Sequence, residues 1–309
     1  MIDDGRARSR WFTRYAYLVL AYTLLVVLWG AYVRATGSGA GCGSHWPLCN
    51  GEVIPRAPEA ATRIEFTHRL TSGLSLLLVA ALTVWALRAF PQGNRVRKFA
   101  VLSAAFLVIE ALLGAGLVLL EYVAYNASPG RAWYLSAHLV NTQLLLAVLA
   151  LTAWHSHRKG STRTAPRPRL IAAALPAALL ISVTGAVAAL GDTLILGAAA
   201  AGAHPADPAA AAGDLVRLRL LHPFIAVLAG AFLIWAALGA AARERNAVAR
   251  QARMWAAALV LVQWGAGIIN VILKAPVWMQ LLHLLLANAL WLALVILFVE
   301  TEESRGERT

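Results

Sequence analysis

The sequence predicts an all-α polytopic membrane protein, with eight transmembrane helices arranged as two pseudo-symmetric four-helix bundles. Of its 309 residues, 60% are hydrophobic and only 14% are charged, which is more apolar surface than a soluble core can bury. No signal-peptide cleavage site follows the first apolar run, so we expect that run to remain as a span. Eight apolar runs are long enough to cross about 30 Å of hydrocarbon, and they cover 12–34, 63–89, 96–121, 132–155, 168–190, 214–241, 249–274 and 277–300.

The distribution of cations predicts how the spans are oriented. The formal net charge is +12, but the Lys and Arg residues cluster in alternate connections, as orientation signals do, so nucleic acid is not an expected partner. The amino terminus and the connections after spans two, four and six are basic and should face the cytoplasm. The connections 35–62 and 191–213 are poor in cations and should face outward. This predicts a multi-pass protein of the cell (inner or plasma) membrane with both termini cytoplasmic.

A basic loop with Gly, Ser and Pro at 155–169 separates two halves, 1–158 and 159–309. Short segments of small residues recur in the two halves, and we expect them to let helix backbones approach closely. The same offset superimposes histidines, which predicts parallel copies related by an axis along the membrane normal. The recurring segments are Gly30-Ala31-Tyr32-Val33 with Gly185-Ala186-Val187-Ala188, and Gly114-Ala115-Gly116 with Gly265-Ala266-Gly267.

Four of the eight histidines lie inside predicted spans, namely His68, His138, His222 and His283. Each follows the outer end of an even-numbered span by about one to two turns, so all four are expected at one depth. Imidazoles on facing helices of an apolar bundle are typical axial ligands of haem iron, whereas zinc would require more ligands, closer together. We therefore expect two haem sites, one in each half. The other histidines, expected to be solvated, are His45, His155, His157 and His204.

The two halves differ in the charges near these histidines. Glu65 precedes His68 by three residues, on the same helix face, whereas Arg219 precedes His222. The carboxylate can act as a general base or stabilise a developing positive charge, which predicts a reactive site in the first half and a resident electron-transfer haem in the second. Candidate contacts for haem propionates, with interfacial snorkelling as the alternative, are Arg34, Arg131, Arg217 and Arg219.

Two further features complete the candidate site. Glu110 in the third span corresponds to Gln263 in the repeat, and we expect it to be a packing or hydrogen-bonding residue first and a proton-path residue second. Cys42 and Cys49 share one outward loop, where an oxidising compartment favours a disulfide over two free thiols. Such a bond can staple the loop or take part in redox exchange, and the sequence leaves both roles open.

In these residues the chain resembles the haem A synthase family, over nearly its whole length. The resemblance rests on the segment from Gly30 to Gly39 that leads to Cys42 and Cys49, on Glu65-Phe66-Thr67-His68-Arg69, and on the histidines of the repeated halves. The second cysteine pair that some members carry in the later outer loop is absent. The roles that the resemblance implies are substrate haem ligands for His68 and His138, haem b cofactor ligands for His222 and His283, a catalytic carboxylate for Glu65, and an outer-loop disulfide for Cys42 and Cys49.

The reaction implied by the resemblance is oxidation of the C8 methyl group of haem O to a formyl group, giving haem A for terminal oxidases, with water as the oxygen source. The implied partners are haem O as substrate, membrane lipid, haem O synthase, oxidase assembly factors and an unidentified electron acceptor. Two other classes stay open, a quinone-linked di-haem b-type electron carrier and a haem transporter or chaperone. A carboxylate beside only one histidine pair, with an outer disulfide, favours the synthase.

Overall fold

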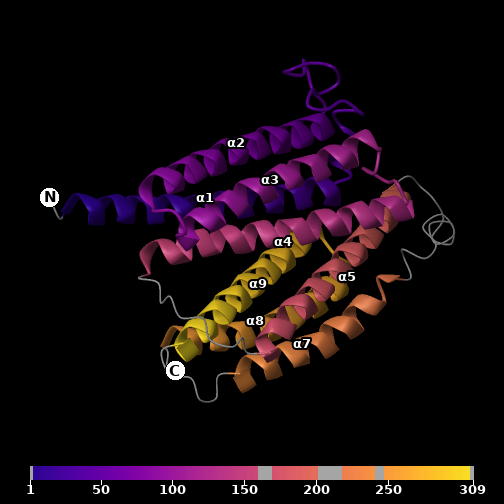
Figure 1. Cartoon of the computed structure of the whole chain (residues 1–309). Helices are drawn as coiled ribbons and strands as arrows, with labels where there is room; N and C mark the ends of the chain where they lie inside the picture. The colour runs from indigo at the N-terminus through magenta and orange to yellow at the C-terminus, as the bar shows by residue number, and fades with distance from the viewer. Residues whose placement is uncertain (1–2, 159–168, 201–217, 241–246, 307–309) are drawn as a thin grey trace. The chain divides into compact units, whose positions relative to one another are not determined.

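The computed structural model describes residues 3–158, 169–200, 218–240 and 247–306, and it confirms the predicted all-α membrane class. Eight of the described helices are long and apolar enough to cross a membrane, so the chain is a multi-pass membrane protein. The elements in Figure 1 are α1 (Asp3–Ala35), the short 3-10 helix η1 (Ser38–Ala40), α2 (Ala60–Ala89), α3 (Arg95–Leu119), α4 (Pro129–His157), α5 (Arg169–Ala200), α7 (Leu221–Ala240), α8 (Ala247–Ile272) and α9 (Val277–Gly306).

Two predicted boundaries differ from the structure. The fifth span was expected to end at residue 190, but α5 continues to Ala200. The added segment is rich in Leu and Ala, which favour helix, and its charged Asp192 is paired with Arg219 at 3.0 Å. The sixth span was expected over 214–241, whereas α7 begins at Leu221, and residues 214–217 lie outside the described part of the chain.

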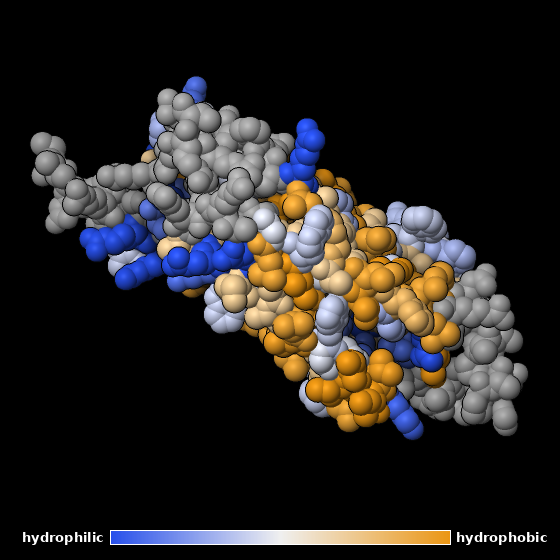
Figure 2. All heavy atoms as spheres, turned by 90° about the horizontal axis from the view of Figure 1, so that it is seen from below, coloured by the Kyte–Doolittle hydropathy of each residue, from blue (hydrophilic) through white to orange (hydrophobic). Residues whose placement is uncertain are grey.

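Apolar side chains on the helix surfaces agree with a lipid environment. Several leucines within the candidate spans are more than half exposed, namely Leu25, Leu77 and Leu112. Hydrophobic atoms cover much of the face shown in Figure 2. In water such a surface would mark an aggregation site, but in a bilayer it is the surface that contacts lipid tails.

The chain forms two compact units, one of Met1–His157 with Gly185–Leu220 and the other of Arg158–Thr184 with Leu221–Thr309. The helix α5 contributes its carboxyl-terminal part to the first unit, where Leu190 and Leu194 pack against Leu135 of α4. The functional halves 1–158 and 159–309, and the pseudo-symmetry between them, stay predictions.

Within the first unit, α1 and α3 each pack against both α2 and α4. This arrangement leaves α2 and α4 diagonally opposite, so inward side chains on these two helices face a common interior. Fully buried residues such as Phe12, Leu82 and Leu149 fill the core. The hydroxyl of Tyr15 also donates to the Leu78 carbonyl of α2 at 3.0 Å.

Within the second unit, α8 packs against both α7 and α9. The indole Nε1 of Trp264 donates to the carbonyl of Ala226 in α7, and the amide Nε2 of Gln263 donates to the carbonyl of His283 in α9, both at 3.0 Å. Polar side chains thus join α8 to each neighbour, as is common where lipid provides no hydrophobic force between helices.

We predict that Leu149→Ala lowers the stability of the purified protein by about 2–5 kcal/mol, because the side chain is fully buried and its loss leaves a cavity. Leu112→Ala is the control, since Leu112 is 61% exposed on α3, and it should change stability much less. Thermal unfolding in detergent measures both variants. Equal effects would contradict the assignment of the inward and lipid-facing surfaces.

Candidate functional site

His68 and His138 meet inside the first unit. They come from the diagonally opposite helices α2 and α4, and they are close enough to interact electrostatically. Both residues are partly buried, and the Nδ1 atom of each ring is enclosed without a hydrogen bond among the described residues, although Nδ1 of His138 lies 3.3 Å from a carboxylate oxygen of Glu110. A buried imidazole nitrogen without a protein partner, as in His68, is unusual and favours a site that takes a ligand.

Glycines on neighbouring helices make room for these rings. A Cβ added at Gly30 of α1 would lie 3.0 Å from Cε1 of His68, closer than ordinary packing allows, whereas one at Gly114 of α3 would lie 3.9 Å from Cε1 of His138. From the sequence, these small residues are expected to bring helix backbones together. At both positions the nearest atoms are instead those of an imidazole ring.

The second unit brings together His222 and His283, which also interact electrostatically. The Thr184 hydroxyl of α5 lies 3.0 Å from Nδ1 of His222. Gly267 of α8 faces His283, since a Cβ added there would lie 3.4 Å from its Cε1. His222 is the second residue of α7, so it does not follow its helix start by one to two turns as the sequence predicted.

Glu65 is 3% exposed and is held by the loop that precedes α2. Its Oε2 accepts a hydrogen bond from the backbone N–H of Cys42 at 2.8 Å, and its Oε1 pairs with Nη2 of Arg69 at 2.5 Å. Arg69 Nη1 in turn donates to the carbonyls of His45 and Leu48, both at 2.6 Å. The hydrogen bonds described for this carboxylate therefore go to the loop and to Arg69.

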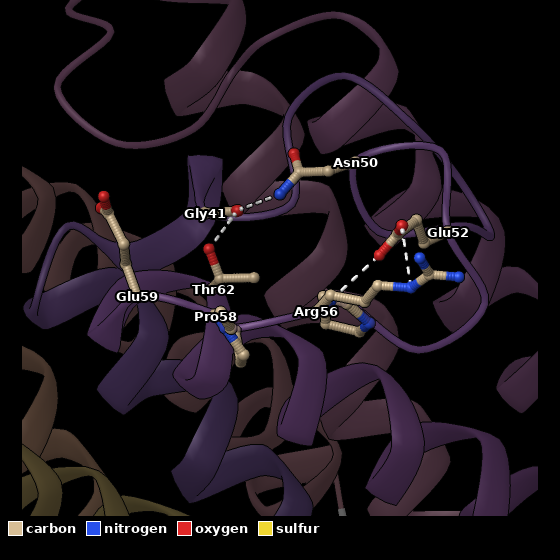
Figure 3. Close-up of a pocket in the computed structure, with 9 residues that line it drawn as sticks. Gly41, Asn50, Glu52, Arg56, Pro58, Glu59 and Thr62 are labelled. Carbon is tan, nitrogen blue, oxygen red and sulfur yellow. Dashed lines mark hydrogen bonds and ion pairs between the residues drawn. The ribbon is translucent and has the colours of Figure 1, made fainter.

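The predicted disulfide between Cys42 and Cys49 is confirmed, and both cysteines are buried. Next to it, the carbonyl of Gly41 accepts hydrogen bonds from Thr62 Oγ1 at 2.7 Å and Asn50 Nδ2 at 3.2 Å (Figure 3). A Cβ at Gly41 would lie 2.4 Å from the carbonyl carbon of Ala61, so only glycine allows the loop to lie this close to α2.

A polar pocket of about 320 Å³ opens beside this contact (Figure 3). Thr62 and Gly41 form part of its wall, and Glu52 and Arg56 form an ion pair at 3.7 Å on another side. Since Thr62 precedes Glu65 by three residues, the pocket lies about one helical turn from the buried carboxylate.

The carboxylate beside an imidazole is Glu110 of α3. Its Oε2 accepts a hydrogen bond from Asn141 Nδ2 at 2.5 Å, its Oε1 accepts one from the Thr142 hydroxyl, and Oε1 also lies 3.3 Å from Nδ1 of His138 without the alignment of a hydrogen bond. Its predicted hydrogen-bonding role is confirmed. The proximity of Glu110 to His138 is not predicted from the sequence, although Glu110 precedes Gly114 by four residues and therefore shares its helix face.

Two of the four arginines predicted to contact haem propionates bind acceptors on α5. Arg34 Nη1 donates to the carbonyl of Ala189 at 2.6 Å and to Thr193 Oγ1 at 2.7 Å. Arg219 pairs with Asp192, as noted above. These contacts show that both guanidinium groups already have protein acceptors.

Arg131 at the start of α4 is different. It is 2% exposed, its Nη1 donates to the carbonyl of Asn126 at 2.9 Å, and its Nε has no hydrogen-bond partner among the described residues. It also interacts electrostatically with Arg34, a second cation. A buried cation with an open donor and a like charge nearby favours an anionic ligand. Arg217 lies outside the described residues.

The histidines predicted to be solvated differ in their exposure. His45 and His157 are exposed, and His204 lies outside the described residues. The expectation is wrong for His155, which is 8% exposed and stacks on Phe99 of α3 with ring centroids 5.5 Å apart. The last turns of α4 remain packed in the bundle, because the Ser156 hydroxyl also lies 2.7 Å from that of Thr13 in α1.

The donor set fits haem better than a metal cluster. No three His, Cys, Asp or Glu side chains converge within the described ranges, as a zinc centre would require. Each unit instead offers two imidazoles, buried nitrogens and a small residue against the rings. Together these features define a helical membrane protein with paired intramembrane histidines, a class to which b-type haem proteins belong.

Comparison with known families identifies the group within this class. The family model COX15-CtaA, described as cytochrome oxidase assembly protein, matches residues 13–295, and the chain belongs to this family. The match includes both histidine pairs, Glu65 and the disulfide loop.

The similar curated proteins have two different names. A protein of Thermus thermophilus named protoheme IX farnesyltransferase is 49% identical over 297 residues, which is 95% of this chain but 49% of that protein. The chain therefore spans about half the length of this relative. Proteins named heme A synthase match over shorter stretches, with 44% identity over 31% of the chain and 32% of the protein in Exiguobacterium sibiricum, and 34% identity over 46% and 48% in Alkalihalophilus pseudofirmus.

We predict that Gly30→Ala displaces the His68 ring, because the added Cβ would lie 3.0 Å from it. Low-spin haem binding at this site, measured by optical titration with protohaem, should weaken while the protein stays folded. Gly73→Ala is the control, since nothing lies within 4 Å of a Cβ at that helical glycine, and it should be neutral or slightly stabilising. Unchanged haem binding in Gly30→Ala would contradict a fixed position for His68.

Proposed function

We propose that this protein is a haem A synthase that oxidises the C8 methyl group of haem O to a formyl group. The observation that carries the proposal is the chemical difference between the two histidine pairs. Carboxylates, Glu65 and Glu110, lie on the elements around the first pair, whereas the neutral side chains of Thr184 and Gln263 lie around the second. A pure electron carrier has no need of this difference, but an enzyme with one reacting haem and one resident haem does.

In the first unit, His68 and His138 would hold the iron of haem O from opposite sides of the bundle interior. Oxidation of a methyl group by water to a formyl group releases protons and electrons in equal number, so the site needs a proton acceptor near the substrate. Glu65 is the candidate, since it lies one turn from His68 and is held in place by Cys42 and Arg69. Positioned acid–base groups typically contribute about 10²–10⁴-fold to a rate.

In the second unit, His222 and His283 would hold a haem b. When bound, this haem would accept the electrons of the oxidation and pass them to an external acceptor. The Thr184 hydroxyl would keep the His222 ring oriented through its Nδ1 atom, as partners of ligand histidines commonly do. The Thr184 hydroxyl is neutral, which suits a haem ligand such as His222 that remains unchanged through turnover.

The propionates of the substrate would find their cation at Arg131. Its Nε is the open donor, and its burial makes the charge effective. Arg34 would contribute its charge while its Nη1 remains bound to α5. For Arg217 and Arg219, a contact with the propionates is supported by the sequence alone.

The name of the Thermus relatives supports a link to farnesyl transfer. Transfer of a farnesyl group to protohaem yields haem O, the substrate proposed here, so a haem O synthase is the partner that chemistry favours, together with oxidase assembly factors. The matched region is only half of those relatives, so we assign the farnesyl transfer in their name to the half that this chain does not match. With the basic segments inside, both termini would be cytoplasmic in the cell membrane.

We predict that Glu65→Gln stalls the conversion of haem O to haem A by about 10²–10⁴-fold. The amide can still accept the Cys42 N–H bond, and Arg69 keeps its two loop carbonyls, so the protein should fold and retain its resident haem. Haem extraction and chromatography after expression with a haem O source measure the products. Glu59→Gln, on the exposed loop before α2, should leave haem A output unchanged.

The same chromatograms separate the competing functions. Accumulation of haem O or a hydroxylated product in Glu65→Gln supports the synthase. Near-normal haem A output in Glu65→Gln would exclude Glu65 from the reaction. Absence of haem A in the unchanged protein would favour the electron carrier or the transporter. Formation of haem O from protohaem would favour a farnesyltransferase.

We predict that His222→Ala and His283→Ala each abolish the low-spin spectrum of the haem that purifies with the protein, because each removes one axial ligand. Both rings are part of the second unit, so the first pair should still bind added protohaem. Optical and EPR spectra measure both effects. An unchanged low-spin signal in the two variants would show that the retained haem is held elsewhere.

A further inference from the structure

We infer that Glu110 is a positioning residue for the haem ligand His138, and that it makes the first haem site electronically different from the second. The inference rests on the proposed function, since it assigns a role at the site that would hold haem O. It concerns a residue that the family resemblance leaves without a role. The arrangement is a carboxylate behind a ligand imidazole, on a helix next to the one that carries the ligand.

The carboxylate of Glu110 is fixed in direction by two donors from α4. Asn141 binds Oε2 at 2.5 Å, and Thr142 binds Oε1. Oε1 is left 3.3 Å from Nδ1 of His138. Because Thr142 and His138 are four residues apart on one helix, the donor that holds Oε1 and the ring that faces it lie on the same face.

Helix cohesion does not require this carboxylate. Asn141 Nδ2 also donates to the carbonyl of Phe106 in α3 at 2.9 Å, and Thr142 Oγ1 lies 2.9 Å from the carbonyl of His138 in its own helix. Both donors would therefore keep an acceptor if residue 110 were apolar. The position of Oε1 beside the ring, rather than the joining of α3 to α4, is what the carboxylate adds.

The second unit provides a natural comparison. Gln263 precedes Gly267 by four residues, as Glu110 precedes Gly114, and both glycines face the ligand rings. Gln263 Nε2 donates to the backbone carbonyl of His283, and the Nδ1 atom of His283 has no partner among the described residues. One ligand thus has a carboxylate facing Nδ1, and its counterpart has a neutral amide directed at its backbone.

A carboxylate behind a ligand imidazole has two known physical effects. It fixes the ring orientation, so that Nε2 of His138 is the atom left for the iron, and it raises the basicity of the ligand. A more basic ligand stabilises oxidised iron and lowers the reduction potential, which is one of the means by which a protein tunes haem. Glu110 therefore gives the first site the lower potential and helps electrons leave toward the second.

The test measures the reduction potential and EPR spectrum of protohaem added to the purified protein comprising all 309 residues. Glu110→Gln removes the charge, and Glu110→Ala also removes the acceptors. Ser103→Ala is the control, because Ser103 is a fully buried polar residue of the same helix whose hydroxyl bonds to Phe99 of that helix. Gln263→Glu is the reciprocal variant, read on the resident haem, and it keeps the test valid if a variant at position 110 fails to fold.

We expect Glu110→Gln to raise the potential of the added haem by about a tenfold change in its redox equilibrium, equal to about 59 mV for one electron, with altered low-spin g values. Glu110→Ala should weaken haem binding by about 10–100-fold, Ser103→Ala should change neither property, and Gln263→Glu should lower the potential of the resident haem. The inference is overturned if Glu110→Gln leaves the potential and the spectrum of the added haem unchanged, or if Gln263→Glu leaves the potential of the resident haem unchanged. Neither result would contradict the proposed haem sites. Failure of the unchanged protein to bind protohaem through His68 and His138 overturns both this inference and the proposed site.

Discussion

Placing an imidazole ring between two helices in hydrocarbon is the constraint on which this structure depends. The ring needs space that an ordinary side chain on the neighbouring helix would fill, and its nitrogens need partners that lipid cannot supply. Gly30 and Gly267 provide the space at two of the rings, while Thr184 and Glu110 provide polar atoms near Nδ1 at two of them. The helices next to the histidine-bearing helices therefore provide the space and the polar atoms that the rings need. The small and polar residues in their sequences serve this purpose.

The loop before α2 is part of the site rather than a cover added to it. A buried ion pair is stable only when its remaining donors and acceptors are satisfied. For Glu65 and Arg69 the loop satisfies them, through the N–H of Cys42 and the carbonyls of His45 and Leu48. Any change that moves the disulfide segment must therefore also move the carboxylate, which ties the position of Glu65 to the state of the disulfide.

The fold, and the intramembrane histidines that the structure brings together in pairs, could be predicted from the sequence because both depend on local signals. Apolar runs define the spans, and the four intramembrane histidines stand out by their cost in lipid. The environment of each residue could not be read in the same way. Spacing along α2 placed Glu65 near His68, but its partners are a loop backbone and Arg69, and the carboxylate near an imidazole proved to be Glu110, on another helix. The expectation for His155 was wrong because its burial depends on the packing of α4, which no local pattern reveals.

The contacts of Glu110 have a consequence for how the protein is built. An acidic residue well inside a single span adds roughly 3 kcal/mol to the free energy of its insertion into the bilayer, and α3 alone would carry that penalty. Asn141 and Thr142 of α4 meet both carboxylate oxygens, and only a short connection separates the two helices. Insertion of α3 and α4 together, as a helical hairpin, would avoid the penalty that α3 alone would carry.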